Sequence, residues 1–376
     1  MRQRVFFHQV SWTIIVCALA IVTIGAIALA RADEIAGAGG RYVNRQVAWS
    51  ALAVFTAALA CWPTYRVLAR WSYAVLTVAV AMLLLVYWFP PVNGAHRWIR
   101  LGPVGWQPSE FAKLAFVLGM ARYLMYRDSY RELHGLLIPL VFVMVPVLLI
   151  LKEPDLGTSL VFLPVLFAML FAAGARARHL IIVSIVGAAM LPILWSQMSR
   201  EQRSRITALA EQTAPGQTPT RDGYHLHAAK QLLAMGGGWG SLIRGELTDD
   251  VGAYRVPEAH TDSIVCLVGE RFGIVGIGIL LSLFAILTQR ILTIAAATHE
   301  PFGRLVATGV AAMIAVQVTI NIGMMVGLVP ITGLTLPLVS YGGSNLLVNA
   351  IGLGLVLNIG LRPGYEVTGE PFVFAE

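Results

Sequence analysis

The chain has 376 residues, of which 57% are hydrophobic and only 12% are charged, and its mean hydropathy is +0.73. A soluble domain cannot keep that much apolar surface away from water, so the composition excludes a soluble enzyme and indicates a membrane protein. The net charge of +7 fits basic loops that face lipid headgroups. Because no basic run is interleaved with aromatic residues, nucleic acid is not expected as a partner.

Ten apolar segments predict an all-α polytopic membrane protein with about ten transmembrane helices. Each segment has roughly the length that a helix needs to cross a bilayer. Three of the segments are short, so eight or nine helices stay open as alternatives. In chain order, we expect the helices at about residues 10–30, 46–62, 72–90, 110–126, 136–151, 157–174, 180–197, 263–288, 304–328 and 344–361.

The distribution of basic residues predicts how these helices are oriented. If the N-terminus is cytoplasmic, the inner side holds twelve arginines and the short outer loops hold six Lys or Arg. Both termini are then cytoplasmic, and residues 1–376 form a single transmembrane domain with one long extracytoplasmic loop at 198–262. Within this loop, the sequence GYHLHAAKQLLAM (Gly223–Met235) predicts an amphipathic helix on the membrane surface.

The first polar stretch on the outer side is NGAHRWIRLGPVGWQPSEFAKLA (Asn93–Ala115). It predicts a structured loop followed by a helix that Ser109 caps, with Glu110 in the first turn. Lys113 lies in the apolar part, where a charge costs about 2.5–3.5 kcal/mol, so it is a functional candidate. The alternative is that Lys113 pairs with Glu110 three residues earlier. Arg97 is either functional or an interfacial anchor.

The second stretch, KEPDLGTSL (Lys152–Leu160), places two carboxylates between two predicted helices. Taken alone, it predicts a plain turn in which Asp155 caps the next helix.

The third stretch, VPEAHTDSIV (Val256–Val265), crowds polar residues directly before an apolar run. Asp262 is either the N-cap of the next helix or a carboxylate that faces a cavity. Glu270 follows eight residues later, about 12 Å along the helix on nearly the same face, which favours a cavity. The alternative for Glu270 is neutralisation by Arg271.

The fourth stretch, LVPITGLTLPLVSYGGSNLL (Leu328–Leu347), interrupts an apolar segment with proline and glycine. Irregular backbone at membrane depth is tolerated only where protein buries it or where it lines a cavity. The glycine-rich turn Ser340–Ser344 predicts backbone N–H groups that face an anion. The alternative is an ordinary outer loop with a re-entrant bend.

Together the four stretches predict an outward-facing polar cavity. Arg97, Arg100 and Lys113 would form a cationic wall, and Asp262 and Glu258 would bring carboxylates to the opposite wall. This combination suits a lipid-linked phosphate substrate with a general base, and it suits an ion-coupled transporter equally well.

The order and spacing of these stretches resemble the SEDS family, whose best known members are RodA and FtsW. The resemblance covers most of the chain and is carried by HRWI, QPSEFAKL, EPDLGTSL, PEAHTDSI and LPLVSYGGSN. It implies the family's ten-span helical bundle. The sequence GYHLHAAKQLLA favours the RodA branch, whereas GLTLPL and PEAHTD look closer to FtsW. Ser263 departs from the family pattern, in which an aromatic residue follows the aspartate.

The resemblance implies a peptidoglycan glycosyltransferase of the bacterial cytoplasmic (inner) membrane. Such an enzyme polymerises lipid II for cell elongation or division. Its implied partners are a class B penicillin-binding protein that cross-links the strands and other membrane proteins of the elongation or division complex. Asp262 takes the position of the family's proposed catalytic aspartate. The residues implied in substrate binding are Arg97, Glu110, Lys113, Ser340, Gly342, Gly343 and Ser344.

The expected reaction is attack of an acceptor hydroxyl on the anomeric carbon of a polyprenyl-pyrophosphate donor. Asp262 would take the proton of the hydroxyl. Arg97 would bind the leaving pyrophosphate as a bidentate donor and Lys113 as a point charge, while Glu110 orients Lys113. Mg²⁺ is the one cofactor that could help to stabilise the charge of the pyrophosphate, and no residue is assigned as a metal ligand.

Three alternatives stay open. Glu258 and Asp262 could act as a carboxylate pair of the kind that glycosidases use. The same cavity could serve a lipid II flippase or another transporter of lipid-linked precursors. A silent membrane scaffold is the third alternative, and it would leave Lys113 and Asp262 without a purpose.

Overall fold

The structure is a computed structural model, and it describes residues 11–92, 94–101, 104–211, 222–245, 254, 256–362 and 364. Parts of the predicted long loop, at 212–221, 246–253 and 255, lie outside the described residues, as do Asn93 and most of the segment after Arg362.

Helices make up nearly all of the described structure. A short antiparallel hairpin, β1 (Ile99–Leu101) and β2 (Val104–Trp106), precedes α5, and three short 3₁₀ helices cover Val86–Trp88, Ser129–Arg131 and His134–Leu136. The α-helices are α2 (Trp12–Ala36), α3 (Arg41–Ala60), α4 (Tyr65–Leu85), α5 (Pro108–Leu124), α6 (Leu137–Lys152), α7 (Leu156–Ala173), α8 (Ala177–Ala189), α9 (Leu191–Gln197), α10 (Arg200–Glu211), α11 (Asp222–Gly236), α12 (Ser241–Arg244), α13 (Ile264–Ala297), α14 (Pro301–Val326) and α15 (Gly343–Leu361).

The predicted all-α polytopic class is confirmed, but the count of ten spans is not. Every predicted span falls on a helix. However, only seven segments of the described chain are long and apolar enough to cross a membrane: Trp12–Ala36, Val67–Trp88, His134–Lys152, Leu156–Ala173, Ile264–Ala297, Pro301–Val326 and Gly343–Leu361.

The other three predicted spans fall short for different reasons. Helix α3 begins with Arg41, and Arg45 and Gln46 follow in its second turn. Helix α5 has only 17 residues. The seventh predicted span is divided into α8 and α9 at Met190, because Pro192 has no N–H to continue the helical hydrogen bonds.

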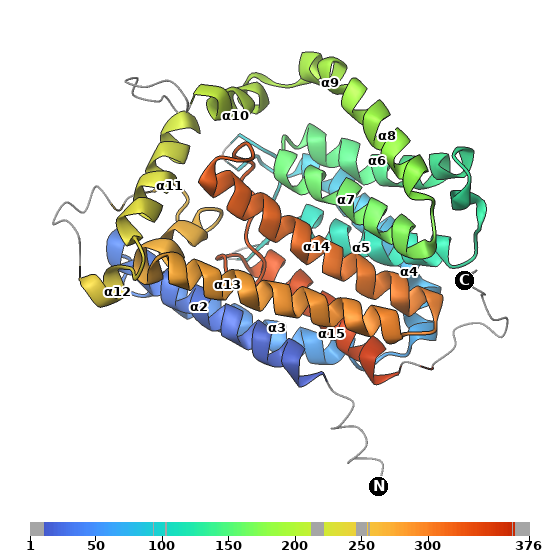
Figure 1. Ribbon diagram of the computed structural model, residues 1–376, viewed down its shortest axis with the longest axis horizontal. Coiled ribbons are helices and arrows are strands. Elements are labelled where there is room, and N and C mark those ends of the chain that lie inside the picture. Colours follow the sequence, from blue (N-terminus) through green and yellow to red (C-terminus); the bar gives the residue numbers. More distant parts are fainter. Residues whose placement is uncertain are drawn as a thin grey trace, which may run out of the picture.

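Helix α14 runs through the middle of the bundle, between α13 and α7 (Figure 1). Helices α2, α3 and α15 pack together on one side, and α4, α5 and α6 on the other. The described chain begins and ends at the same end of the bundle, where Ile14 and Leu361 line one apolar pocket. Helices α10, α11 and α12 cover the opposite end.

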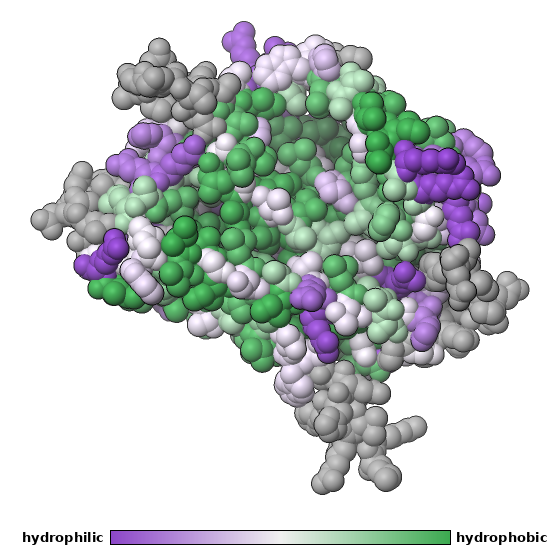
Figure 2. All heavy atoms as spheres, in the orientation of Figure 1, coloured by the Kyte–Doolittle hydropathy of each residue, from purple (hydrophilic) through white to green (hydrophobic). Residues whose placement is uncertain are grey.

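Apolar side chains cover the outside of the bundle as well as its core. Figure 2 shows hydrophobic residues across the visible face, with hydrophilic residues gathered mainly toward its ends. Val16, Phe55, Leu148 and Ile274 are exposed members of this surface. Such a belt fits lipid rather than water as its surroundings.

The predicted amphipathic helix at Gly223–Met235 is present as α11, but its apolar face packs on protein and not on lipid. Ala229 and Leu232 are fully buried, and α11 contacts α13 and α14. The helices approach very closely, because a Cβ on Gly236 would lie 1.9 Å from the carbonyl oxygen of Gly269.

Candidate functional site

The four polar stretches meet at the end of the bundle that α10, α11 and α12 cover. The backbone N–H of Gln107 donates to Ser344 Oγ at 3.1 Å, and the Gln107 side chain donates to Asp155 Oδ2 at 3.4 Å. A Cβ built on Gly333 would lie 3.6 Å from Asp262 Oδ2. Residues far apart in the sequence therefore surround one location.

Asp262 is not a helix cap. The N-cap of α13 is Ser263, and no side chain accepts a hydrogen bond there. Asp262 is only 8% exposed. Its backbone carbonyl accepts from Asn321 Nδ2 at 2.8 Å. This bond fixes the backbone of Asp262 and does not use its carboxylate. The capping alternative is therefore wrong.

Burial changes the acidity of Asp262. Loss of water around the carboxylate is the main cause that raises its pKa, His225 opposes the shift and the carboxylate of Glu258 adds to it, and the resulting pKa is about 6. A carboxylate with this pKa is still largely ionised at neutral pH, yet it is more basic than an exposed aspartate. These properties suit a general base.

The predicted pairing of Lys113 with Glu110 is confirmed. Lys113 Nζ lies 2.9 Å from Glu110 Oε1 and 2.9 Å from Gln317 Oε1, and Asn345 Nδ2 donates to Glu110 Oε2 at 2.8 Å. Both charged residues are enclosed, with 3% and 2% of their surface exposed. Glu110 thus orients Lys113, and direct contact between Lys113 and substrate stays a prediction.

The predicted cap of α5 is wrong. The helix begins at Pro108, and its N-cap is Gln107 without a side-chain bond. The fixed φ of proline suits the first turn, where its missing N–H is not needed. Ser109 is buried, and its hydroxyl has no partner within the described chain.

Two buried amides on α14 lie close to the site residues. Gln317 binds Lys113, and Asn321, one turn later, donates to the carbonyls of Asp262 and Leu334. Residues four apart share one helix face. Sequence reasoning missed these amides, although their signal is an amide pair at i and i+4 within an apolar run. Asn345 and Asn349 repeat that signal on α15.

Arg97 holds the turn between α6 and α7. Its guanidinium donates to the carbonyl of Glu153 at 3.0 Å and to the carbonyl of Pro154. Glu153 is fully buried, and burial raises its pKa to about 8. Its carboxyl group is therefore mostly protonated at neutral pH, so it leaves the Arg97 charge largely unneutralised for an anion. The prediction that Asp155 caps α7 is confirmed by Thr158 N–H, 3.1 Å from Asp155 Oδ1.

The serine hydroxyls of the glycine-rich turn bind backbone. Ser340 Oγ accepts from the N–H of Leu336 at 2.8 Å, and Ser344 Oγ accepts from Gln107. Gly342 is the N-cap of α15. A Cβ on Gly343 would lie 2.5 Å from the Trp49 ring. These contacts fix the turn, and its predicted binding of an anion stays a prediction.

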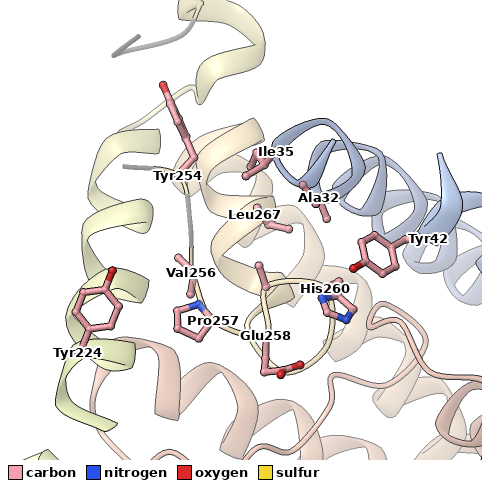
Figure 3. A pocket seen from close by; sticks show the side chains of 12 residues that line it. Ala32, Ile35, Tyr42, Tyr224, Tyr254, Val256, Pro257, Glu258, His260 and Leu267 are labelled. Atoms are coloured by element: carbon pink, nitrogen blue, oxygen red, sulfur yellow. The ribbon is translucent and has the colours of Figure 1, made fainter. Parts of the chain in front are cut away.

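A pocket of about 450 Å³ opens beside the Asp262 segment. Figure 3 shows Glu258 and His260 on the loop, Tyr42 opposite them, and Tyr224 on α11. The rings of Tyr42 and His260 stack at 4.5 Å. Glu258 is exposed and has a φ of 49°, a left-handed conformation that non-glycine residues seldom adopt. The pocket volume is typical of small-molecule sites.

Glu270 does not extend the site into the membrane. Its carboxylate binds Arg31 of α2 at 3.3 Å, so the predicted neutralisation by Arg271 is wrong. Gly273, with a φ of 67°, bends α13 just after this pair. Glu270 therefore belongs to a short helical segment before the bend.

These features define a polytopic helical membrane protein. At one end it has a buried carboxylate, Asp262, on the loop that lines an aromatic pocket, and its core holds the buried ion pair of Lys113 and Glu110. The family model described as "Cell cycle protein", for FtsW, RodA and SpoVE, matches residues 8–362. The chain belongs to this family, and it is a multi-pass protein of the bacterial cytoplasmic membrane.

Relatives named FtsW and MrdB resemble the chain. The probable peptidoglycan glycosyltransferase FtsW of Trichlorobacter lovleyi is 34% identical over 85% of this chain and 84% of its own. The peptidoglycan glycosyltransferase MrdB of Escherichia coli K12 is 38% identical over 78% of this chain and 79% of its own. The predicted family is confirmed, and the choice between RodA and FtsW stays open.

Solved structures agree in fold. A structure described as "Structural coordination of polymerization and crosslinking by a peptidoglycan synthase complex" matches with a TM-score of 0.80 and 30% identity, over 94% of this chain and 98% of the other. RodA of Thermus thermophilus matches with a TM-score of 0.68 and 28% identity, over 95% and 98% of the two chains.

Proposed function

We propose that the chain is a peptidoglycan glycosyltransferase that polymerises lipid II into glycan strands at the outer face of the cytoplasmic membrane. The observation that carries this proposal is Asp262, a buried carboxylate with a pKa raised to about 6, which follows directly on the loop residues that line an aromatic pocket. Relatives over most of the chain are named for the same activity.

In the proposed reaction, the acceptor hydroxyl forms a bond to the anomeric carbon of the donor sugar. The bond between that carbon and the pyrophosphate oxygen breaks, and polyprenyl pyrophosphate leaves with the electron pair. Asp262 accepts the proton of the hydroxyl, which is otherwise a poor nucleophile. The pyrophosphate needs no general acid, because it is already a stable anion.

The leaving pyrophosphate needs cations. Arg97 is the first candidate, since its contacts in the described chain are carbonyls. Arg205 on α10 is a second candidate that the sequence did not reveal. Its Nη1 donates to the Thr332 carbonyl at 3.4 Å, next to Gly333, which faces Asp262. Lys113 is enclosed and binds Glu110 and Gln317, so in the proposed reaction it acts on the pyrophosphate only indirectly.

Mg²⁺ stays a proposal. The described residues contain no group of three or more His, Cys, Asp or Glu that could hold a metal ion. The phosphates of the substrate would supply oxygen ligands of the kind that magnesium prefers, and no step of the proposed reaction is assigned to the ion.

The aromatic pocket is the proposed place for a sugar of the lipid-linked substrate. Tyr42, Tyr224 and Tyr254 bring apolar ring surfaces and hydroxyls to its wall, which suits a ligand with both apolar faces and hydroxyl groups. Burial lowers the pKa of His260, and the carboxylates of Glu258 and Asp33 oppose this shift. Glu258 adds the one carboxylate among the lining residues.

The rate of polymerisation is expected to fall as pH decreases through about 6. Asp262 must be ionised to accept a proton, and protonation below its raised pKa removes the base. The rate should change little between about pH 7 and 8, where Asp262 is ionised. The measurement is the initial rate of lipid II consumption across pH at saturating substrate. A flat profile from about pH 5 to 8 would contradict Asp262 as the base.

For its partners, we propose a class B penicillin-binding protein and other membrane proteins of the elongation or division complex. The support is a structural relative described as a peptidoglycan synthase complex that coordinates polymerisation with cross-linking. The cross-linking partner would need to reach the end of the bundle where Asp262 lies, because new strands form there.

The test of the proposed function uses the purified chain with a class B penicillin-binding protein whose transpeptidase is blocked. Lipid II is added, and the products are separated by length. Glycan strands longer than the substrate disaccharide support the proposal. Transfer of lipid II across the bilayer of vesicles without strand formation would instead favour the flippase alternative.

A further inference from the structure

A second buried side chain reaches the Asp262 segment from the long loop. His225 of α11 is 9% exposed, and its Nε2 lies 2.9 Å from the carbonyl oxygen of Pro257 and 3.0 Å from Ser263 Oγ. Ser263 Oγ in turn lies 3.4 Å from Asp262 Oδ1. One imidazole thus touches both ends of the turn that carries Asp262.

These contacts determine which ring nitrogen carries a proton. A backbone carbonyl only accepts hydrogen bonds, so His225 Nε2 must be protonated to bind Pro257. Ser263 Oγ then accepts from the same N–H, and its own hydroxyl proton has two acceptors at 3.4 Å, the Asp262 carboxylate and the Pro257 carbonyl. With the first of these acceptors, the result is a chain of donors that starts on α11 and ends at the Asp262 carboxylate.

The backbone around α11 keeps His225 in this place. Gly236 at the end of α11 lies against Gly269 of α13, with no room for a side chain between them. The N–H of Ile274 donates to the carbonyl of Gly237 at 2.9 Å. Helix α11 is therefore fixed to the same helix that Asp262 precedes.

From this geometry we propose that His225 is a positioning residue for Asp262 and acts on it through Ser263 and the Pro257 carbonyl. This proposal rests on the proposed function, since it assigns a role in that reaction. It makes α11, which is fixed to α13, part of the catalytic apparatus.

The charged surroundings of Asp262 give this role a measurable consequence. The titratable groups that act on its carboxylate are His225 from α11, Glu258 from its own loop and Cys266 from α13, and Arg205 from α10 reaches the neighbouring Thr332. His225 is the one that lowers the pKa of Asp262 most. Loss of the imidazole should therefore raise the pKa of Asp262 above about 6.

The experiment compares His225→Ala, His225→Gln and Ser263→Ala with wild type in the lipid II assay across pH. His227→Ala is the matched control, because His227 is an exposed histidine two residues along the same helix. Each protein is first checked for folding by size-exclusion chromatography and thermal unfolding in detergent.

We expect His225→Ala to lower kcat by up to about 100-fold, the effect of a misplaced catalytic group. We also expect it to move the acidic limb of the pH profile to higher pH. His225→Gln keeps an N–H for the Pro257 carbonyl and should restore most of kcat above pH 7, while the limb stays at higher pH because glutamine does not replace the electrostatic effect of His225 on Asp262. Ser263→Ala should lower kcat, and His227→Ala should behave as wild type.

Two results would overturn the proposal. One is His225→Ala with the kcat and pH profile of wild type. The other is a lower kcat with an unchanged acidic limb and no rescue by His225→Gln, which a merely structural role predicts. If wild type and His227→Ala make no strands at all, the proposed function itself fails and this proposal fails with it.

Discussion

Replacement of Asp262 by asparagine is expected to abolish strand formation and to leave the fold intact. Asparagine has nearly the same shape, and the bond from Asn321 goes to the backbone carbonyl of residue 262, which the change does not remove. The amide cannot accept a proton at neutral pH, so the rate should fall by about 10²–10⁴-fold. The measurement is the initial rate of lipid II polymerisation with the partner's transpeptidase blocked.

Glu258→Gln is the companion variant that tests the carboxylate-pair alternative. Glu258 lies on the same loop and lines the aromatic pocket, so if Asp262 alone is the base, this change should raise KM and leave kcat far less affected than Asp262→Asn does. If Glu258→Gln is inactive and Asp262→Asn is active, the base is Glu258. If both variants lose all activity, the carboxylate-pair alternative is favoured over a single base.

The fold class could be predicted from the sequence because each helix that crosses a bilayer needs a long, continuous apolar segment, which can be recognised without knowing the tertiary structure. Every expected span coincides with a helix. The count was harder to predict, because a helix such as α5 has 17 residues, which is at the lower limit of the length that crosses a bilayer. Composition also did not reveal that α8 ends at Ala189, whereas Pro192 was a visible signal for a break.

The candidate site was predictable where partners are close in sequence. Glu110 and Lys113 are three residues apart on one helix, and their pair was foreseen. The partner of Glu270 was not, because Arg31 is 239 residues away and only tertiary packing brings it there. His225 was missed for the same reason, since nothing in its own helix points to Ser263.

The buried pair of Lys113 and Glu110 gives the second large prediction, which concerns stability. Lys113→Met removes the ammonium and leaves the Glu110 carboxylate buried with only the amide of Asn345 to compensate it. Breaking a buried ion pair in this way costs about 3–5 kcal/mol. We expect a large loss of thermal stability in detergent, measured by the unfolding midpoint, and loss of activity through unfolding.

The double variant Lys113→Met with Glu110→Gln separates stability from catalysis, because it removes both charges together. Much of the stability should return, since no uncompensated charge stays in the core. Lys152→Met is the control, because Lys152 is an exposed lysine at the end of α6. If the double variant is stable and active, the pair only holds α5 against α14. If it is stable but inactive, the charge of Lys113 contributes to the reaction beyond its role in holding α5 against α14.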